Sequence, residues 1–309
     1  MIRYTIRRLL MLIPILIAVS LVVYFIVDLA PGDVVDVIAP DDASPEDKEL
    51  LREMMGLNDP FIIRYARYMQ GLMRGDLGKS YVNNRDVFEV YFSRLPNTLL
   101  LALAGAFVAV LIAVPLGVVS AMHRGSWKDA ISMIFGLLGL SMPNFWLGLL
   151  LIIFFSLKLG LFPSYGSEGW SSIVLPAITV GTAQAALVMR TTRSSMLEVV
   201  RQDYLRTARA KGVPERTVIY KHALRNALIP IVTVMGTQLG VALGGAVFTE
   251  TVFAWPGVGR LVVDAINSRD IPMVTGCLIL TTMLASFLIL LVDIAYAFID
   301  PRIKARYTK

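Results

Sequence analysis

The stretch LPNTLLLALAGAFVAVLIAVPLGVVSAM, Leu95–Met122, is 28 residues long and contains no charged side chain. An α-helix rises about 1.5 Å per residue, and about 20 mostly apolar residues are enough to cross the hydrocarbon core of a bilayer. This stretch is therefore long enough to span a membrane. It predicts a transmembrane helix and raises the question of how many more such helices the chain contains.

Five further charge-free stretches of similar length lie on either side of the first. They are Leu9–Val27, Ala130–Leu157, Gly169–Met189, Asn226–Thr249 and Ile271–Val292. The six stretches together hold 142 of the 309 residues, which is more than the core of one soluble domain would bury in helices. The sequence therefore predicts an all-α polytopic membrane protein with six transmembrane helices.

The composition agrees with this fold class. Apolar residues make up 56% of the chain and charged residues 17%, and the mean hydropathy is +0.67. A soluble domain has about 45–50% apolar and about 25% charged residues, so a soluble enzyme is excluded, and so is a disordered chain. A single cysteine, Cys277, and two histidines, His123 and His222, also exclude a disulfide framework and a Cys- or His-rich metal site.

Lysine and arginine are distributed unequally over the segments that join these stretches. If the N-terminus is cytoplasmic, four segments lie on the cytoplasmic side: 1–8, 123–129, 190–225 and 300–309. These four segments contain 18 Lys and Arg residues, whereas the two short outer segments, 158–168 and 250–270, contain 3. Short cytoplasmic loops carry the positive excess in membrane proteins. Both termini are therefore expected in the cytoplasm, and the net charge of +6 marks topology rather than a nucleic-acid partner.

The long outer segment and the remaining spans suggest a division of the chain. Residues 1–94 would form the first transmembrane helix and the outer segment, and residues 95–309 the transmembrane core, with its cytoplasmic loop at 190–225. The outer segment contains two short amphipathic stretches. It is equally consistent with a solvated cap and with a docking surface for an outer partner.

The cytoplasmic loop 190–225 is longer than a simple connection needs. A helix is predicted from Asp203 to Lys211, ended by Gly212 at the position after the C-cap. Pro214 and Glu215 then suit the first turn of a second short helix, because proline needs no N–H there and an acidic side chain complements the helix dipole. We call the predicted helix–glycine–helix feature at 203–225 the elbow.

Span five contains a stripe of small residues, Gly236, Gly240 and Gly244, spaced four apart. Such stripes let two helix backbones approach closely in a membrane, where packing rather than hydrophobicity drives association. The stripe predicts close packing within the chain, or else a seam between subunits or a lining of the translocation path.

Two strings resemble catalytic motifs, and each fails at one position. The string Gly75–Ser80 ends like a phosphate-binding loop, but Met73 stands where that pattern needs a glycine. The string Gly139–Pro143 begins like a serine nucleophile motif but ends in proline instead of glycine. The sequence therefore predicts no catalytic site.

The elbow resembles the cytoplasmic loop of the permease subunits of bacterial ATP-binding-cassette (ABC) importers. That loop carries Glu-Ala-Ala-x-x-x-Gly and then an Ile-x-Leu-Pro segment, which Ala208, Gly212 and Leu224 match. The strings RTARAKG at 206–212 and HALRNALIP at 222–230 resemble the variant found in the dipeptide, oligopeptide and nickel branch.

Further motifs, in the same order along the chain, are similar to the B-type permease of that branch. They are PGD at 31–33, GLNDP at 56–60, GDLGKS at 75–80, LPNT at 95–98, ETVFAWPGVG at 250–259 and DPR at 300–302. The resemblance covers nearly the whole chain, which is identified as a member of this family. It implies the fold of a type I ABC importer transmembrane domain.

The resemblance also implies partners and a location. A homologous second permease would complete the pathway through the lipid bilayer, two cytoplasmic ATPase subunits would bind ATP and Mg²⁺, and an extracytoplasmic substrate-binding protein would deliver cargo. This chain would then be a transport subunit without its own ATPase site, cofactor or metal. The membrane would be the inner or plasma membrane of a prokaryote.

The coupling role carries over to the elbow residue by residue. The expected ATPase-coupling residues are Arg206, Thr207, Ala208, Ala210, Lys211, Gly212, Pro214, Glu215, His222 and Arg225. On the outer side, Phe253 and Trp255 are candidates either for anchoring at the membrane interface or for contact with the binding protein.

The expected cargo is a dipeptide or oligopeptide, because most of this branch imports peptides. Nickel, or another small solute such as glutathione or an oligosaccharide, is the alternative within the same importer type. An ATP-independent secondary carrier is the alternative outside it, although the long elbow argues against that class.

Overall fold

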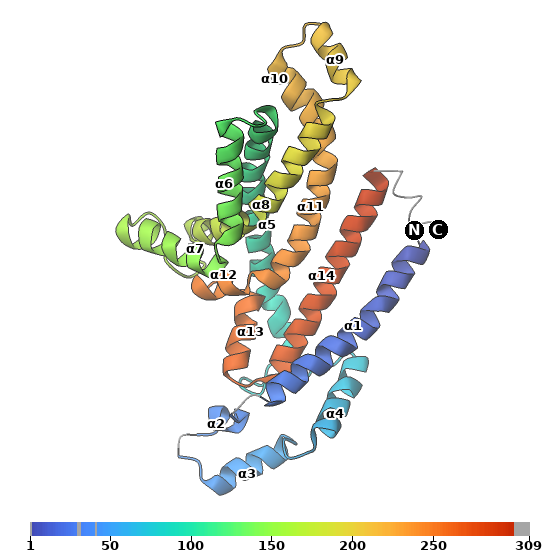
Figure 1. Ribbon diagram of the computed structural model, residues 1–309. Helices are drawn as coiled ribbons and strands as arrows, with labels where there is room; N and C mark the ends of the chain where they lie inside the picture. The colour runs from blue at the N-terminus through green and yellow to red at the C-terminus, as the bar shows by residue number, and fades with distance from the viewer. Residues whose placement is uncertain (1, 30–31, 41, 300–309) are drawn as a thin grey trace. The chain divides into compact units, whose positions relative to one another are not determined.

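The computed structural model describes residues 2–29, 32–40 and 42–299. In these ranges the secondary structure is helical, apart from an isolated β-bridge between Lys79 and Asp86 (Figure 1). The chain forms two compact units. Among the described residues, the first comprises Leu99–Trp255 and 287–299, and the second comprises Ile2–Thr98 and Pro256–Ser286. The predicted C-terminal cytoplasmic segment, 300–309, lies outside the described residues.

The first unit is built around the central helix α8 (Val174–Val199), which packs against α6, α7 and α11. Its other elements are most of α5 (Val87–Met122), α6 (Trp127–Ser141), α7 (Asn144–Leu151), the π-helix η1 (Ile152–Lys158), the 3₁₀-helix η2 (Trp170–Ile173), α9 (Asp203–Ala210), α10 (Glu215–Thr217), the π-helix η3 (Val218–Ala223), α11 (Leu224–Gly245) and α12 (Val247–Val252).

Small residues bring α5 and α8 together. A Cβ atom at Gly105 would lie 2.6 Å from a methyl group of Val180, and one at Gly181 would lie 2.7 Å from the carbonyl oxygen of Gly105. These contacts are too short for any side chain larger than hydrogen. Ala109 and Ala113 are fully buried along the same side of α5. The two helices therefore pack as closely as their backbones allow, which is how helices associate in membranes.

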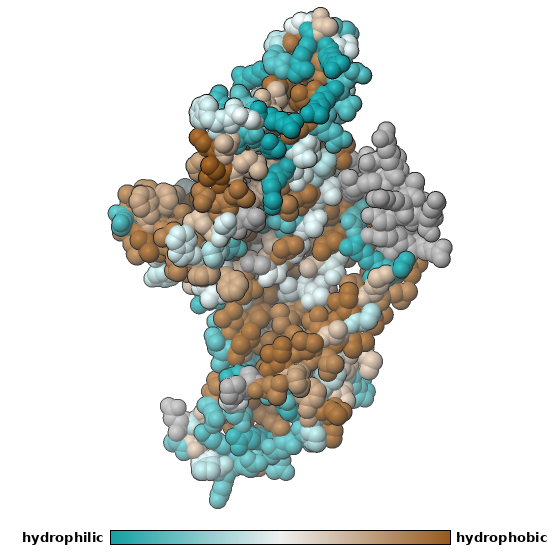
Figure 2. Space-filling view, viewed as in Figure 1, coloured by the Kyte–Doolittle hydropathy of each residue, from teal (hydrophilic) through white to brown (hydrophobic). Residues whose placement is uncertain are grey.

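The second unit contains a long first helix and the outer segment. Its elements are α1 (Ile2–Leu29), α2 (Val34–Ile38), α3 (Pro45–Met54), α4 (Phe61–Met73), the start of α5, α13 (Val258–Asn267) and the first half of α14 (Ile271–Ile299). The ring of Tyr24 on α1 lies 5.8 Å from that of Phe61 and 5.6 Å from that of Tyr68 on α4, so aromatic contacts join the two helices. Figure 2 shows hydrophilic surface over α2 and α3 and hydrophobic surface along α1.

Within the described ranges, five helices are long and apolar enough to cross a membrane: Thr5–Leu29, Val87–Met122, Trp170–Val199, Glu215–Gly244 and Ile271–Ile294. They confirm the all-α, multi-span prediction. The remaining predicted span, Ala130–Leu157, the third along the chain, is not one straight helix, because Trp127–Gly139 and Asn144–Lys158 meet at an angle of 100°. The break falls at Met142, whose extended backbone (ψ 123°) is the conformation that a following proline, Pro143, favours.

Candidate functional site

The elbow connects α8 to α11 and contains α9, α10 and η3 (Figure 1). It forms one end of the first unit, and Figure 2 shows mainly hydrophilic surface there. The predicted helix boundary is confirmed within one residue, since α9 ends at Ala210 and Lys211 is its C-cap. Pro214 is the N-cap of α10, one position before the first helical residue.

Gly212 closes α9 with a left-handed turn. Its φ is +77°, as expected for a glycine after the C-cap. The N–H of Gly212 donates to the carbonyl of Arg209 at 2.9 Å, and that of Val213 donates to the carbonyl of Ala208 at 3.2 Å. These two bonds form a Schellman motif, which satisfies carbonyls at the helix end. The turn therefore has one defined backbone geometry.

An ion pair spans the same turn. Arg209 donates from Nε to Glu215 Oε2 at 3.0 Å and from Nη2 to Glu215 Oε1 at 2.8 Å. This two-pronged pairing joins α9 to α10 and holds the pKa of Arg209 above its ordinary value. On the other side, Asn226 donates to the hydroxyl of Tyr204 at 2.7 Å and so ties α11 to α9. The sequence predicted a helix-dipole role and a coupling role for Glu215, but not its pairing with Arg209.

The underside of the elbow is apolar and packed. Leu205 of α9 and Val218 of η3 are fully buried, in one cluster with Val118 of α5 and Met196 of α8. Both α9 and η3 therefore pack against the ends of α5 and α8. Because such cores are close-packed, a displacement of the elbow displaces the ends of these helices with it.

The predicted coupling residues occupy the outer surface of the elbow. Exposed are Arg206, Thr207, Ala210, Lys211, Gly212, Pro214, Glu215 and Arg225, whereas Ala208, Arg209 and His222 are half-buried. Arg216 and Lys221 are also exposed there, so the surface is strongly basic. Among the described residues no three His, Cys, Asp or Glu side chains gather as metal ligands. The elbow can bind a partner, but it brings together no set of reactive groups.

An ion pair next to the elbow, between a buried carboxylate and a half-buried arginine, was not predicted. Asp129, at the start of α6, accepts hydrogen bonds from Nε and Nη2 of Arg193 on α8, at 3.0 and 2.9 Å. The same carboxylate accepts from the hydroxyl of Ser120 and from the N–H of Gly125. The loop between α5 and α6 is thereby attached to α8 six residues before that helix ends. The sequence offered one signal for this pair: Asp129 and Arg193 have opposite charges and lie in two predicted cytoplasmic segments, 123–129 and 190–225.

The glycine stripe of α11 divides into two parts. Gly236 is buried, and a Cβ atom there would lie 2.5 Å from a methyl group of Val292 on α14, so this glycine serves packing within the chain. Gly240 is also buried. Gly244 is exposed, with no atom within 4 Å of an added Cβ among the described residues. The packing interpretation therefore holds at Gly236 and does not extend to Gly244.

Phe253 and Trp255 are inside the first unit, with exposed fractions of 1% and 2%. Phe253 packs against Gly148 of α7, and Trp255 lies in a cluster with Leu101 of α5 and Val180 of α8. Neither side chain presents a surface to a partner or to the membrane interface. The expected direct roles, an interfacial anchor or a contact with a binding protein, are therefore corrected to packing, because these large aromatic rings fill the space between helices.

Comparison with family models gives two matches that together cover most of the chain. Residues 113–305 match "Binding-protein-dependent transport system inner membrane component", and residues 1–102 match the N-terminal part of the membrane component of binding-protein-dependent transport systems.

Named relatives match over nearly the full length. The dipeptide transport system permease protein DppB of Alkalihalophilus pseudofirmus is 42% identical, covering 98% of this chain and all of that protein. The glutathione transport system permease protein GsiC of Escherichia coli K12 is also 42% identical, over 98% of this chain and 99% of that protein.

Solved structures share the fold at low sequence identity. A chain of the MetNI methionine ABC transporter, in an inward-facing conformation, superposes with a TM-score of 0.58 at 20% identity and covers 69% of this chain and 97% of its own length. A chain of an amino acid ABC transporter gives a TM-score of 0.51 at 14% identity, over 70% of this chain and 94% of its own. The fold is therefore that of an ABC importer membrane subunit.

Proposed function

The chain belongs to the family of binding-protein-dependent transport system inner membrane components, and from this membership we propose that it imports peptides as one of two homologous permease subunits of an ABC importer. The importer would lie in the inner or plasma membrane of a prokaryote. Two cytoplasmic ATPase subunits would bind ATP and Mg²⁺, so that this chain needs no cofactor of its own. An extracytoplasmic binding protein would deliver the cargo.

The elbow is the observation that carries the mechanical part of this proposal. Its outer face is basic and exposed, while its underside is packed onto α5 and α8. A partner that binds the outer face can therefore move two membrane helices without contacting them. We assign this face to the ATPase subunits, whose closure on ATP would shift the permease between two states that differ in their contacts with ATPase and binding protein.

The relatives support peptides as the cargo class. One is named for dipeptide transport and the other for glutathione transport, and both resemble this chain at 42% identity over almost their full length. Both cargoes are short molecules with amide bonds and free carboxylates. The identity to the two relatives is equal and favours neither cargo over the other. We therefore propose a short peptide as the cargo class.

The test is transport by the complete complex. The four membrane and ATPase subunits are purified together, reconstituted in liposomes and supplied with the cognate binding protein and a labelled dipeptide. We expect uptake that requires both ATP inside and the binding protein outside. Uptake by this chain alone, without ATPase subunits, would identify a secondary carrier and overturn the proposal. Retention of the ATPase subunits on the tagged permease is measured in the same preparation.

Gly212 provides the variant that tests the elbow. A valine there must adopt a φ near +77°, which costs a β-branched residue about 1–3 kcal/mol. We expect Gly212→Val to insert in the membrane normally, lose ATPase subunits during purification and lose most uptake. Gly160→Val is the matched control, because Gly160 also has a positive φ (+62°) with no atom within 4 Å of an added Cβ, but lies far from the elbow in sequence. Equal uptake in the two variants would remove the elbow from the coupling mechanism.

A further inference from the structure

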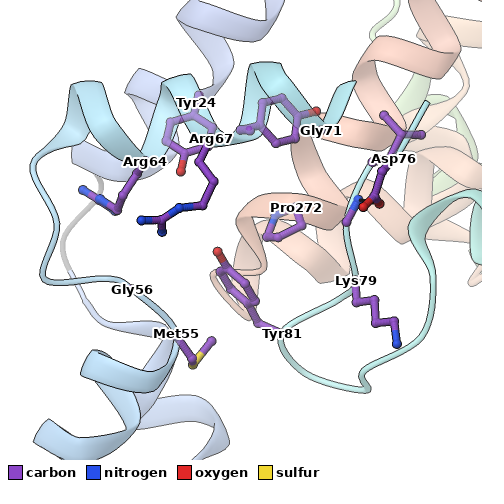
Figure 3. A pocket seen from close by; sticks show the side chains of 13 residues that line it. Tyr24, Met55, Gly56, Arg64, Arg67, Gly71, Asp76, Lys79, Tyr81 and Pro272 are labelled. Carbon is purple, nitrogen blue, oxygen red and sulfur yellow. Dashed lines mark hydrogen bonds between the residues drawn. The ribbon is translucent and has the colours of Figure 1, made fainter. Parts of the chain in front are cut away.

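The second unit contains a pocket of about 230 Å³ that none of the roles above uses. Its walls come from α1, α4, the loop at 76–81 and the start of α14. Figure 3 shows that the guanidinium group of Arg67 and the hydroxyl ends of Tyr24 and Tyr81 lie toward one common space, whereas the guanidinium group of Arg64 extends away from it. A water molecule occupies about 30 Å³ in the liquid, so the pocket has room for part of a small organic molecule.

The two arginines are held in place by carboxylates behind them. Arg64 pairs with Asp28 at 2.6 Å and donates from Nε to the carbonyl of Asp59 at 3.0 Å. Arg67 pairs through Nη2 with the carboxylate of Asp59 at 2.6 Å. A guanidinium group has five N–H donors. These pairs therefore fix the orientation of both groups and leave further donors of each for a ligand.

Glycine at position 56 makes room for Arg67. A Cβ atom there would lie 2.6 Å from Nη1 of Arg67, and the φ of Gly56 is +64°. The guanidinium group can therefore lie directly against the backbone at the edge of the pocket. Any larger residue would push it away and would also strain the turn.

The phenols add hydrogen-bond donors of a second kind. Burial raises the pKa of Tyr81 to about 12 and also raises that of Tyr68, so both keep their proton at neutral pH. The hydroxyl of Tyr68 is buried without a hydrogen-bond partner among the described residues, and Figure 3 draws no hydrogen bond between the side chains that line the pocket. Buried polar groups are rarely left unpaired, so the unpaired hydroxyl of Tyr68 beside this pocket calls for an explanation.

The charge balance favours a monoanionic group over a dianion. Arg64, Arg67 and Lys79 line the pocket, while Asp76 lines it too and Asp28 and Asp59 pair with the arginines. Three positive and three negative groups leave no net charge to hold a phosphate dianion. A single carboxylate matches the planar geometry of a guanidinium group and accepts hydrogen bonds from it and from phenols.

We propose that this pocket binds the carboxylate of a short peptide, with Arg67, Tyr24 and Tyr81 as its donors. The proposal rests on the proposed peptide-import function and adds a cargo-binding site in the segment 24–81. The aliphatic and ring surfaces of Leu77 and Pro272, which also line the pocket, would contact the rest of the peptide.

The experiment measures binding to the purified complex of permease and ATPase subunits without the binding protein. Equilibrium dialysis with radiolabelled alanyl-alanine gives the affinity, and unlabelled alanyl-alanine amide, which lacks the carboxylate, is the competitor. We expect the free dipeptide to compete and the amide to fail. Arg67→Gln should weaken binding about tenfold or more, equivalent to about 1.4 kcal/mol, and Tyr81→Phe should weaken it by a smaller factor.

Arg74→Gln is the matched control, because Arg74 is an exposed arginine at the end of the same helix and does not line the pocket. Its affinity should equal that of the wild type. All variants must elute as intact complexes, and Tyr81→Phe, which keeps the ring, guards against a packing defect. Equal binding by Arg67→Gln and the wild type, or equal competition by the amide, overturns the proposal.

Two parallel measurements separate this proposal from the proposed function. Dipeptide uptake with the binding protein is measured in proteoliposomes. If the wild type takes up dipeptide but does not bind it in the pocket, only the pocket proposal is overturned. If the wild type shows no uptake and no binding, the pocket proposal and the proposed function are both overturned. The affinity of the binding protein for each complex is measured as well. If Arg67→Gln weakens only that affinity, the pocket takes an acidic side chain of the binding protein, and the assignment to cargo is wrong.

Discussion

Trp255 illustrates how the role of one residue depends on what covers it. The sequence places this aromatic residue beside a predicted outer membrane boundary, where exposed tryptophans are common. The structure instead buries its ring between α5 and α8, against Leu101 and Val180. Hydropathy and position cannot separate these two cases, because an anchoring tryptophan and a packed one have the same neighbours in sequence.

Burial changes what the substitution Trp255→Ala is expected to do. Removing a buried ring leaves a cavity and should lower the free energy of unfolding by about 3–5 kcal/mol. Thermal unfolding of the purified complex in detergent measures the effect. Trp170→Ala is the matched control, since Trp170 is 81% exposed, and its unfolding temperature should stay near that of the wild type. Equal unfolding temperatures in the two variants would contradict the packed position of Trp255.

At the scale of elements, the Asp129–Arg193 pair joins α6 to α8 where these helices approach the elbow. Asp129 is 7% exposed, and its carboxylate accepts four hydrogen bonds, two of them from Arg193. Removing one partner of an ion pair that is partly shielded from water leaves the other charge without compensation, which is more costly than losing the attraction alone. The pair therefore fixes the position of α6 relative to α8.

We expect Asp129→Asn to lower the free energy of unfolding by about 2 kcal/mol, because the half-buried Arg193 would lose its charged partner and keep only a neutral amide beside it. The double variant Asp129→Asn, Arg193→Gln should recover part of this loss, since no uncompensated charge remains at the site. Unfolding of the purified complex is followed for both. The control is Glu89→Gln, which breaks the exposed pair with Arg85 and should cost less than about 1 kcal/mol. A double variant less stable than the single one would contradict a charge effect.

Local sequence patterns predicted the helices better than they predicted the breaks within helices and the contacts between them. Gly212 and its positive φ followed from turn chemistry alone, because only a few residues determine a helix end. The break at Pro143 did not follow, although proline is a helix breaker. Pro14 and Pro230 lie inside α1 and α11 without ending either helix, so proline in an apolar stretch is ambiguous. The contact of Asp129 with Arg193 joins residues 64 positions apart, which no local pattern reports.

For the whole molecule, the orientation in the membrane connects the candidate sites to the two sides. The elbow lies in the first unit and the carboxylate pocket in the second, and the sequence assigns them to opposite sides of the bilayer. That assignment rests on the excess of Lys and Arg in the predicted cytoplasmic segments, 18 against 3 in the short outer ones. A positive excess fixes orientation because basic loops are retained on the cytoplasmic side during insertion.

Cysteine labelling in intact cells tests this orientation. The native Cys277 is fully buried, so background labelling by an impermeant thiol reagent should be low. Arg206→Cys places a thiol on the elbow, at a side chain that is 78% exposed, and Asp264→Cys places one on α13, at a side chain that is 63% exposed. We expect only Asp264→Cys to react in intact cells and both to react after lysis, because exposure is similar and only the membrane separates them. Labelling of Arg206→Cys in intact cells would show that the orientation is the opposite of the predicted one. The elbow would then lie outside the cell, where it could not bind a cytoplasmic ATPase.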